Sequence, residues 1–408
     1  MAAGCLLATL SGAALAQTSP WFVRASLGFL YDTNYLRLAD GQAAPVGYSK
    51  ADSAVTGSLA AGFDQMIGRQ RVFATAELRT ARPTSNTSFG SDGYGVNAGL
   101  DWSTAERLSG SLRASSDRSL ARQDVAAFGF VPERNLQTVS SAEAIFRLGL
   151  VTALSAEAAA GWRQVDYSSA LYDNREFHET WVSAGLRLRP SAISSLGVAL
   201  RETRGTYPRY LALPGGAFLA DDYRGEFVDV TGTYRGSGKT ELRARISSGR
   251  TRHENATQSD FNGITGSLDW IWEATGKLAF TTTLTREPSQ DAYFLSSDPT
   301  IRPLEYSRIS TGLRVRADYA PTAKIGLNAS VAGTHRELSQ SIPVAAGGTT
   351  IVSGMDRTVV LGLGASWTPV RWLRLGCDVG HEVRRGDAPL SSDLSGSSLY
   401  CQVRAELR

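Results

Sequence analysis

KIGLNASVAGTHR, residues 324–336, alternates apolar and polar side chains along its length. Ile325, Leu327 and Val331 share one parity, whereas Asn328 and Arg336 share the other. Successive side chains of a β-strand point to opposite faces of its sheet. Both faces cannot be packed core, because burying an unpaired arginine is too costly. The stretch therefore predicts a strand with one face in an apolar environment and the other in water.

The same alternation recurs in residues 308–319, in residues 372–384 and in many other segments, with a repeat of roughly 40 residues. Each repeat has two alternating segments joined by a tight turn and followed by a longer polar loop. The tight turns fall near Gly68, Thr104, Thr152, Ser191, Ser237, Thr275, Thr322 and Val370. Short turns that alternate with long loops on such strands are typical of transmembrane β-barrels.

We therefore predict an all-β fold, a transmembrane antiparallel up-and-down β-barrel of about 18 strands, with 16 as the alternative count. An open sheet edge in hydrocarbon leaves backbone groups without hydrogen bonds, so the first and last strands, near residues 21–36 and 399–407, are expected to pair. An even strand count makes that pairing antiparallel. It also brings both ends of the barrel to the side of the tight turns, which we assign to the periplasm.

Residues 1–16 are predicted to be a signal peptide. Residues 5–15 form a short apolar run, and Ala14-Leu15-Ala16 before Gln17 fits a cleavage site. A buried N-terminal helix is the alternative interpretation. We expect residues 17–408 to form a single barrel domain that resides in the bacterial outer membrane.

Motifs for catalysis are missing from the sequence. The four histidines, His178, His253, His335 and His381, have neither a metal-ligand spacing nor a catalytic one. The net charge of +3 is close to neutral for 408 residues. We predict that the protein is not an enzyme, and we expect no metal, no cofactor and no nucleic-acid partner.

The water-facing parity is rich in arginine, and we predict that these side chains line the lumen. The candidates are Arg113, Arg147, Arg163, Arg187, Arg189, Arg201, Arg243, Arg245, Arg308, Arg314, Arg316, Arg336, Arg374 and Arg384, with Arg235 and Arg404 on the same parity. Fewer carboxylates share that face: Glu77, Asp101, Glu143, Glu157, Asp229, Asp269, Asp318, Asp378, Glu382 and Glu406. Guanidinium groups bind carboxylate, sulfate or phosphate bidentately, so one hypothesis is a conduit for anions. The other hypothesis is a mutually paired charge network that stiffens the barrel.

Aromatic residues gather at the strand ends, as in the two interfacial girdles of a membrane barrel. Those near the tight turns are Trp102, Tyr234, Trp270, Trp272, Tyr319, Trp367 and Trp372. Those near the long loops are Tyr31, Tyr35, Tyr167, Tyr172, Tyr207, Tyr210, Tyr223, Tyr293 and Tyr306.

Three further features have alternative interpretations. Cys377 and Cys401 share the apolar face of the last two strands, where packing as small apolar residues is favoured over a cross-strand disulfide. Asp32-Thr33-Asn34 is predicted to form a turn, and the alternative interpretation is a site for a cation. Residues 205–222 are predicted to form a long loop that either stays outside or folds inward as a constriction.

Tyr31-Asp32-Thr33-Asn34-Tyr35-Leu36-Arg37-Leu38 resembles the opening segment of the EpsL-type outer-membrane proteins of exosortase-associated exopolysaccharide clusters. Tyr31, Asp32, Asn34 and Arg37 carry the resemblance. It implies an outer-membrane channel for export or assembly of a secreted exopolysaccharide. The expected partners are the lipid bilayer, lipopolysaccharide, a neutral or anionic polysaccharide, and periplasmic or inner-membrane machinery for polysaccharide synthesis.

Two other functions fit the same sequence. A general or sugar-selective diffusion porin for uptake needs only an open, water-lined barrel. A non-conducting scaffold for polysaccharide machinery needs only the barrel and its loops.

The prediction that residues 1–16 are a signal peptide can be tested directly. We expect mass spectrometry of the chain from outer-membrane fractions to find Gln17 at its N-terminus, because the preceding Ala16 completes the cleavage site. A mature chain that retains residues 1–16 would contradict this prediction and favour the buried helix.

Overall fold

The computed structural model describes residues 19–104, 107–121, 133–151, 153–213, 216–236, 238–288, 301–302, 309–344, 348–387 and 390–408. The predicted signal peptide, Arg308, Tyr293 and Tyr306 lie outside these residues. Among the described residues, no helix has the length and hydropathy needed to cross a bilayer.

Nearly all of the described chain is β-strand, with three short 3₁₀ helices in the long loops. The strands are β1 (Trp21–Asp32), β2 (Asp52–Ile67), β3 (Gln70–Pro83), β4 (Ser91–Ser103), β5 (Leu108–Ala121), β6 (Leu136–Val151), β7 (Leu154–Tyr167), β8 (Phe177–Ser191), β9 (Ser194–Ala212), β10 (Phe218–Gly236), β11 (Thr240–His253), β12 (Phe261–Thr275), β13 (Leu278–Glu287), β14 (Ile301–Arg302), β15 (Ile309–Tyr319), β16 (Ile325–Val344), β17 (Gly348–Val370), β18 (Leu373–Gly386) and β19 (Leu394–Leu407). The 3₁₀ helices are η1 (Thr87–Phe89), η2 (Ala170–Arg175) and η3 (Thr257–Ser259).

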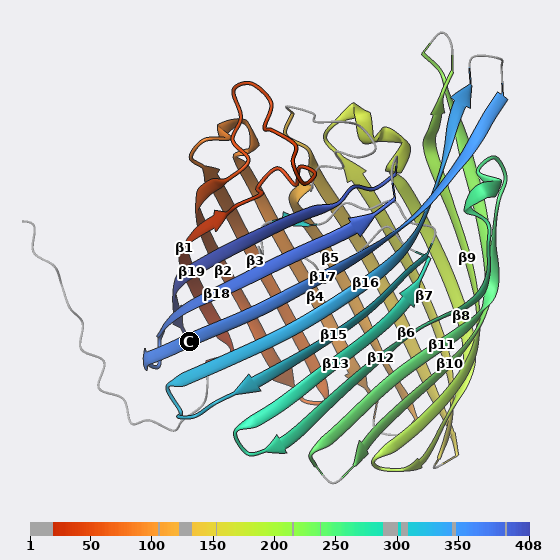
Figure 1. Cartoon of the computed structure of the whole chain (residues 1–408). Helices are drawn as coiled ribbons and strands as arrows, with labels where there is room; N and C mark the ends of the chain where they lie inside the picture. The colour runs from red at the N-terminus through yellow and green to blue at the C-terminus, as the bar shows by residue number, and fades with distance from the viewer. Residues whose placement is uncertain are drawn as a thin grey trace, which may run out of the picture.

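Eighteen strands close into an antiparallel barrel in chain order (Figure 1). The exception is β14, which has two residues and pairs in parallel with the end of β5, so that β13 pairs directly with β15. Closure is made by β1 and β19, whose register runs from Val23 opposite Leu407 to Asp32 opposite Ser398. The 18-strand prediction and the pairing of the first and last strands are confirmed.

The eight predicted tight turns fall between the strand pairs β2–β3, β4–β5, β6–β7, β8–β9, β10–β11, β12–β13, β15–β16 and β17–β18. Two of the predicted turn residues, Thr152 and Ser237, lie outside the described residues. Two of the turns use a left-handed glycine, with φ of +62° at Gly68 and +68° at Gly238. Glycine adopts this conformation without the steric cost that a Cβ imposes. In Figure 1 the turns lie at the lower end of the barrel, and the C-terminus lies at that end too.

The two faces of the barrel wall differ as predicted. The exterior face consists of the apolar parity, with Leu27, Leu200 and Leu363 each about two-thirds exposed. The interior face consists of the polar parity, where Asp229 and Ser247 are buried among neighbouring side chains. An apolar exterior with this degree of exposure requires an apolar solvent, which is the lipid of a bilayer.

Several strands are longer than the 9–11 residues that cross a bilayer. The hairpins β9–β10 and β16–β17 project beyond the rest of the barrel at the upper right of Figure 1. Residues 205–222 are therefore not a loop that folds inward, because most of them continue the β9–β10 ladder. In the opposite direction, β1 stops at Asp32, before the predicted end near residue 36, because a turn begins there.

The aromatic girdle beside the tight turns is confirmed by the exposed exterior positions of Trp270, Trp272, Trp367 and Trp372. The girdle predicted beside the long loops is wrong for at least four of the seven members that the structure describes. Tyr31 is on the exterior face, but Tyr167, Tyr172, Tyr207 and Tyr223 are on the interior side and pack together there. Their parity is the reason, since Tyr167 shares its face with Arg163, and Tyr207 shares its face with Arg201.

Cys377 and Cys401 form a disulfide, so the favoured interpretation of two free thiols is wrong. The two residues stand directly opposite each other on β18 and β19, with their Cα atoms 4.1 Å apart. Opposed positions of an antiparallel pair bring side chains close enough for this bond. The bond lies on the exterior face, one strand away from the β1–β19 closure.

Thiol labelling tests the disulfide. In the mature chain, where Cys377 and Cys401 are the two remaining cysteines, we expect a maleimide reagent in denaturing detergent to add nothing before reduction and two labels after it. The control variant Cys377→Ser should take one label under both conditions. Two labels on the unreduced wild-type chain would contradict the disulfide.

Candidate functional site: the charged interior of the barrel

Arginines and carboxylates of adjacent strands face each other on the interior wall. Glu157 on β7 lies between two arginines, with its Oε2 atom 2.7 Å from Arg147 Nε and 3.0 Å from Arg187 Nε. All three side chains are about one-fifth to one-quarter exposed. A carboxylate held between two guanidinium groups is stabilised in its charged form, and each arginine is partly neutralised in return.

Most of the predicted lumen arginines have such a partner. The pairs are Arg113–Asp101 at 2.5 Å, Arg201–Asp229 at 2.8 Å, Arg245–Glu287 at 2.5 Å and Arg316–Asp318 at 2.8 Å, with Arg24–Glu406 and Arg79–Asp117 as pairs outside the predicted set. The wall is therefore mainly a paired charge network, the second of the two hypotheses. The sequence undercounted carboxylates, because Asp117, Glu287 and Asp356 also have interior parity.

The remaining candidates are placed differently. Arg336 is almost completely buried against Asp356, whose second contact is the Ser391 hydroxyl at 2.8 Å. Arg384 lies 4.0 Å from Glu382, and the guanidinium of Arg163 lies over the Phe177 ring. Arg189 and Arg243 are exposed at the tight-turn end, where Arg243 pairs with Glu241 at 2.5 Å.

Four arginines of interior parity have no carboxylate partner among the residues that the structure describes, namely Arg189, Arg314, Arg374 and Arg404. Arg374 and Arg404 stand directly opposite each other on β18 and β19, and Arg314 lies on β15. Arg374 donates to Ser366 Oγ at 3.0 Å and Arg404 donates to Gln402 Oε1 at 3.4 Å. Within the part of the chain that the structure describes, the buried Nε of Arg404 has no hydrogen-bond acceptor. Two like charges therefore stand opposite each other with only neutral acceptors in their printed hydrogen bonds.

The opening motif anchors a loop. The backbone N–H of Asn34 donates to Asp32 Oδ1 at 2.7 Å in an Asx turn, so the turn predicted for residues 32–34 is present. Arg37, in the left-handed region with φ of +54°, donates to the same oxygen at 3.0 Å and forms an ion pair with the other oxygen at 2.7 Å. Arg37 also lies 3.7 Å from Glu382 on β18. These bonds occupy the Asp32 carboxylate, and among the described residues no cluster of ligands fits a metal ion.

Asn34 is fully buried and joins this loop to itself and to the barrel. Its side-chain amide donates to Leu38 O at 2.8 Å and to Ser395 O at 3.0 Å, and its Oδ1 accepts from the Leu38 N–H at 2.9 Å. Leu36 and Leu38 then pack with Phe89, Leu120 and Leu136 from other strands and loops. The motif thus has a structural role at the long-loop rim.

A second anchor lies at the rim of β10 and β11, beyond their exterior apolar residues. Asp221 is fully buried, and its Oδ2 atom lies 2.7 Å from His253 Nδ1. Burial raises the pKa of Asp221, but hydrogen bonds from His253 and from the backbone N–H groups of Ala256 and Asn255 outweigh burial and lower it. The charged carboxylate therefore fixes the start of the β11–β12 loop.

Comparison with known proteins finds likeness in structure but not in sequence. No family model and no curated protein matches the chain. The solved structure of the outer-membrane protein OpdK from Pseudomonas aeruginosa is 15% identical, with a TM-score of 0.47, over 95% of this chain and 99% of that one. OpdK solved with vanillate is 14% identical over the same shares of the two chains, with a TM-score of 0.48. The FrpB iron transporter from Neisseria meningitidis is 11% identical over 90% of this chain and 62% of that one, with a TM-score of 0.47.

Loss of the Asn34 amide tests the loop anchor. We expect Asn34→Ala to lower the unfolding free energy by about 2 kcal/mol, since it leaves buried hydrogen-bonding groups of Leu38 and Ser395 without partners. Urea unfolding of the barrel in lipid vesicles measures this loss. Trypsin should also cleave faster after Arg37.

The control is Gln42→Ala in the same loop, which removes one exposed hydrogen bond to Ala39 N–H. It should leave the urea midpoint nearly unchanged. Equal midpoints for Asn34→Ala and the wild type would show that the motif does not anchor the loop.

Proposed function

We propose that the chain is a passive diffusion channel of the outer membrane for small polar solutes, with a preference for anions. A closed barrel with an apolar exterior and a charged, hydrated interior supports permeation by water-soluble molecules. The observation that carries the proposal is the interior pair Arg374 and Arg404, two directly opposed arginines without a carboxylate partner among the described residues. Elsewhere on the wall most arginines are paired with carboxylates, with Arg314 and Arg189 as exceptions.

The paired network has its own part in this function. An ion pair that bridges adjacent strands keeps both side chains against the wall and satisfies most of their hydrogen-bonding groups. Glu157 with Arg147 and Arg187 is an example. Solutes then meet few unpaired charges along the wall, so the unpaired arginines dominate the selectivity.

Export of an exopolysaccharide, the main expectation from the sequence, is the second candidate. The resemblance of residues 31–38 to EpsL-type proteins favours it. The loop-anchoring contacts of Asp32, Asn34 and Arg37 account for this motif without a polysaccharide. Deletion of the gene separates the two functions, because export predicts loss of the secreted polymer, whereas a diffusion channel predicts slower entry of anionic nutrients.

Charge reversal of the arginine pair tests the channel. In planar bilayers under a potassium chloride gradient, we expect the wild-type channel to favour chloride. The variant Arg374→Glu/Arg404→Glu should shift the permeability ratio toward potassium at least about threefold, because the local field changes sign.

The matched control is Arg113→Gln/Asp101→Asn, which removes a neutral pair and should leave the reversal potential unchanged. Absence of conductance in the wild type would refute the channel. Conductance with the same ion preference in the charge-reversed variant would refute only the role of the arginine pair.

A further inference from the structure

The exterior face of β9, β10 and β11 changes character towards the long loops. Leu200 and Val228 stand opposite each other and are both exposed, as lipid-facing side chains should be. Two residues further along each strand the exterior side chains become charged, with Glu202 opposite Glu226 and Glu226 opposite Arg250. The hydrocarbon boundary therefore lies between these two rows.

The next exterior row consists of three arginines. Arg204 stands opposite Arg224, and Arg224 stands opposite Arg252, on three adjacent antiparallel strands. We call these three residues the arginine row. Like charges directly opposite each other destabilise a β-sheet, so the row requires negative charge nearby. It lies four residues, or about 13 Å along the strand, beyond Leu200 and Val228.

Two carboxylates position the guanidinium groups without saturating them. Glu202 Oε1 lies 2.7 Å from Arg204 Nε and 3.1 Å from Arg224 Nε. Glu226 lies 3.4 Å from Arg224 and 3.0 Å from Arg250. A guanidinium group has five N–H donors, so each of these arginines keeps donors for another ligand.

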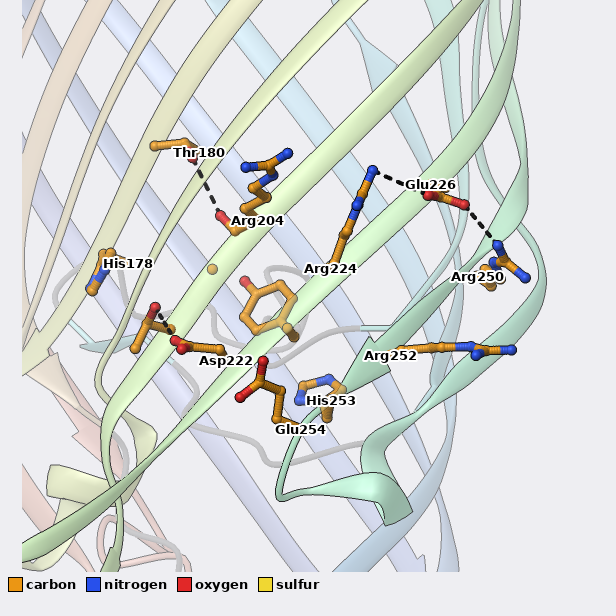
Figure 2. A pocket seen from close by; sticks show the side chains of 13 residues that line it. His178, Thr180, Arg204, Asp222, Arg224, Glu226, Arg250, Arg252, His253 and Glu254 are labelled. Atoms are coloured by element: carbon orange, nitrogen blue, oxygen red, sulfur yellow. Dashed lines mark hydrogen bonds and ion pairs between the residues drawn. The ribbon is translucent and has the colours of Figure 1, made fainter.

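Arg252 has no ion pair or hydrogen bond from its side chain among the described residues. Figure 2 shows Arg204, Arg224 and Arg252 on neighbouring strands, with Glu226 bridging Arg224 and Arg250. Asp222 and Glu254 occupy the next row outward and bound the arginine row on its aqueous side. Asp222 accepts a hydrogen bond from the Thr206 hydroxyl at 2.6 Å.

Two cavities of opposite character meet at this place on the exterior wall. A charged cavity of about 560 Å³ is lined by the arginine row, Arg250 and Glu226 (Figure 2). A more apolar groove of about 630 Å³ borders it on the membrane side and shares Glu226 and Arg250 with it. Val182, Leu200 and Val228 supply the apolar lining of this groove.

We propose that this site binds one phosphorylated lipid of the outer leaflet, with a headgroup phosphate on the arginine row and an acyl chain in the apolar groove. Arginine forks bind phosphate bidentately, and the neighbouring groove accepts hydrocarbon. The site faces the bilayer, and it lies where the long-loop side of the wall changes from apolar to charged. Its ligand is therefore a membrane lipid and not a solute of the channel.

Native mass spectrometry of the detergent-solubilised barrel tests this site. The probes are bis-phosphorylated lipid A, its dephosphorylated form and inorganic phosphate. We expect one tightly bound lipid A per chain, and at least about tenfold weaker binding in Arg204→Gln/Arg224→Gln/Arg252→Gln. Dephosphorylated lipid should bind the wild type equally weakly, and millimolar inorganic phosphate should not displace lipid A.

The matched control removes three exposed arginines at the tight-turn end, Arg69→Gln/Arg235→Gln/Arg371→Gln, and should bind lipid A as the wild type does. Heat-modifiable migration of each variant verifies the folded barrel. If the triple variant does not fold, Arg224→Gln at the centre of the row and Leu200→Trp, which fills the groove, should each weaken binding.

Three results would overturn the proposal. Equal binding by the wild type and the arginine-row variants would remove the site. Equal weakening by the control variant would reduce it to general charge attraction. Dimers or trimers that dissociate when the arginine row is changed would identify the surface as a contact between copies of this chain.

Discussion

Hydrogen bonding of the backbone inside hydrocarbon is the constraint on which the structure depends. A strand edge exposed to lipid leaves N–H and C=O groups unpaired at a cost of several kcal/mol each, so the sheet has to close. The register of β1 with β19 pairs the two ends of the barrel from Val23 opposite Leu407 to Asp32 opposite Ser398. The Arg24–Glu406 ion pair on the interior and the Cys377–Cys401 disulfide on the exterior lie at or beside this closure.

Closure also determines the chemistry of the interior. A barrel of eighteen strands is too wide to be filled by apolar side chains from its wall, so the interior face is polar and hydrated. Charged side chains at that face are partly buried by one another, and a guanidinium left without a partner there loses hydration. Pairing with a carboxylate on the adjacent strand offsets that loss, as Arg201 does with Asp229. Arg374 opposite Arg404 departs from this rule, and a departure of this kind is more informative about function than the pairs that obey it.

Period-two alternation and its breaks are sufficient to predict the strand count and the turn positions, and the need to close the sheet in lipid then predicts the closing pair. Features that depend on contacts between strands were harder to predict. Alternation put Arg113 and Asp101 on one face, but only the register shows that they meet. Proximity to the long loops predicts that Tyr167, Tyr207 and Tyr223 lie at the lipid interface. Their positions in the alternating pattern put them instead on the interior face of the barrel. The disulfide needed the register as well, since Cys377 and Cys401 bond only because they are directly opposed.

The registers of β9, β10 and β11 explain why charged residues have different consequences on the interior and exterior faces of the barrel wall. On the interior face, Arg201 and Asp229 alternate in sign between neighbouring strands and neutralise each other. On the exterior face of the same strands, Arg204, Arg224 and Arg252 repeat the same sign across three strands, and their nearest carboxylates lie one row towards the membrane. Glu202 and Glu226 pair with Arg204 and Arg224 from that neighbouring row, whereas Arg252 has no ion pair among the described residues. The headgroup phosphates of a membrane supply further negative charge at that height, and this is the complementarity on which the proposed lipid site depends.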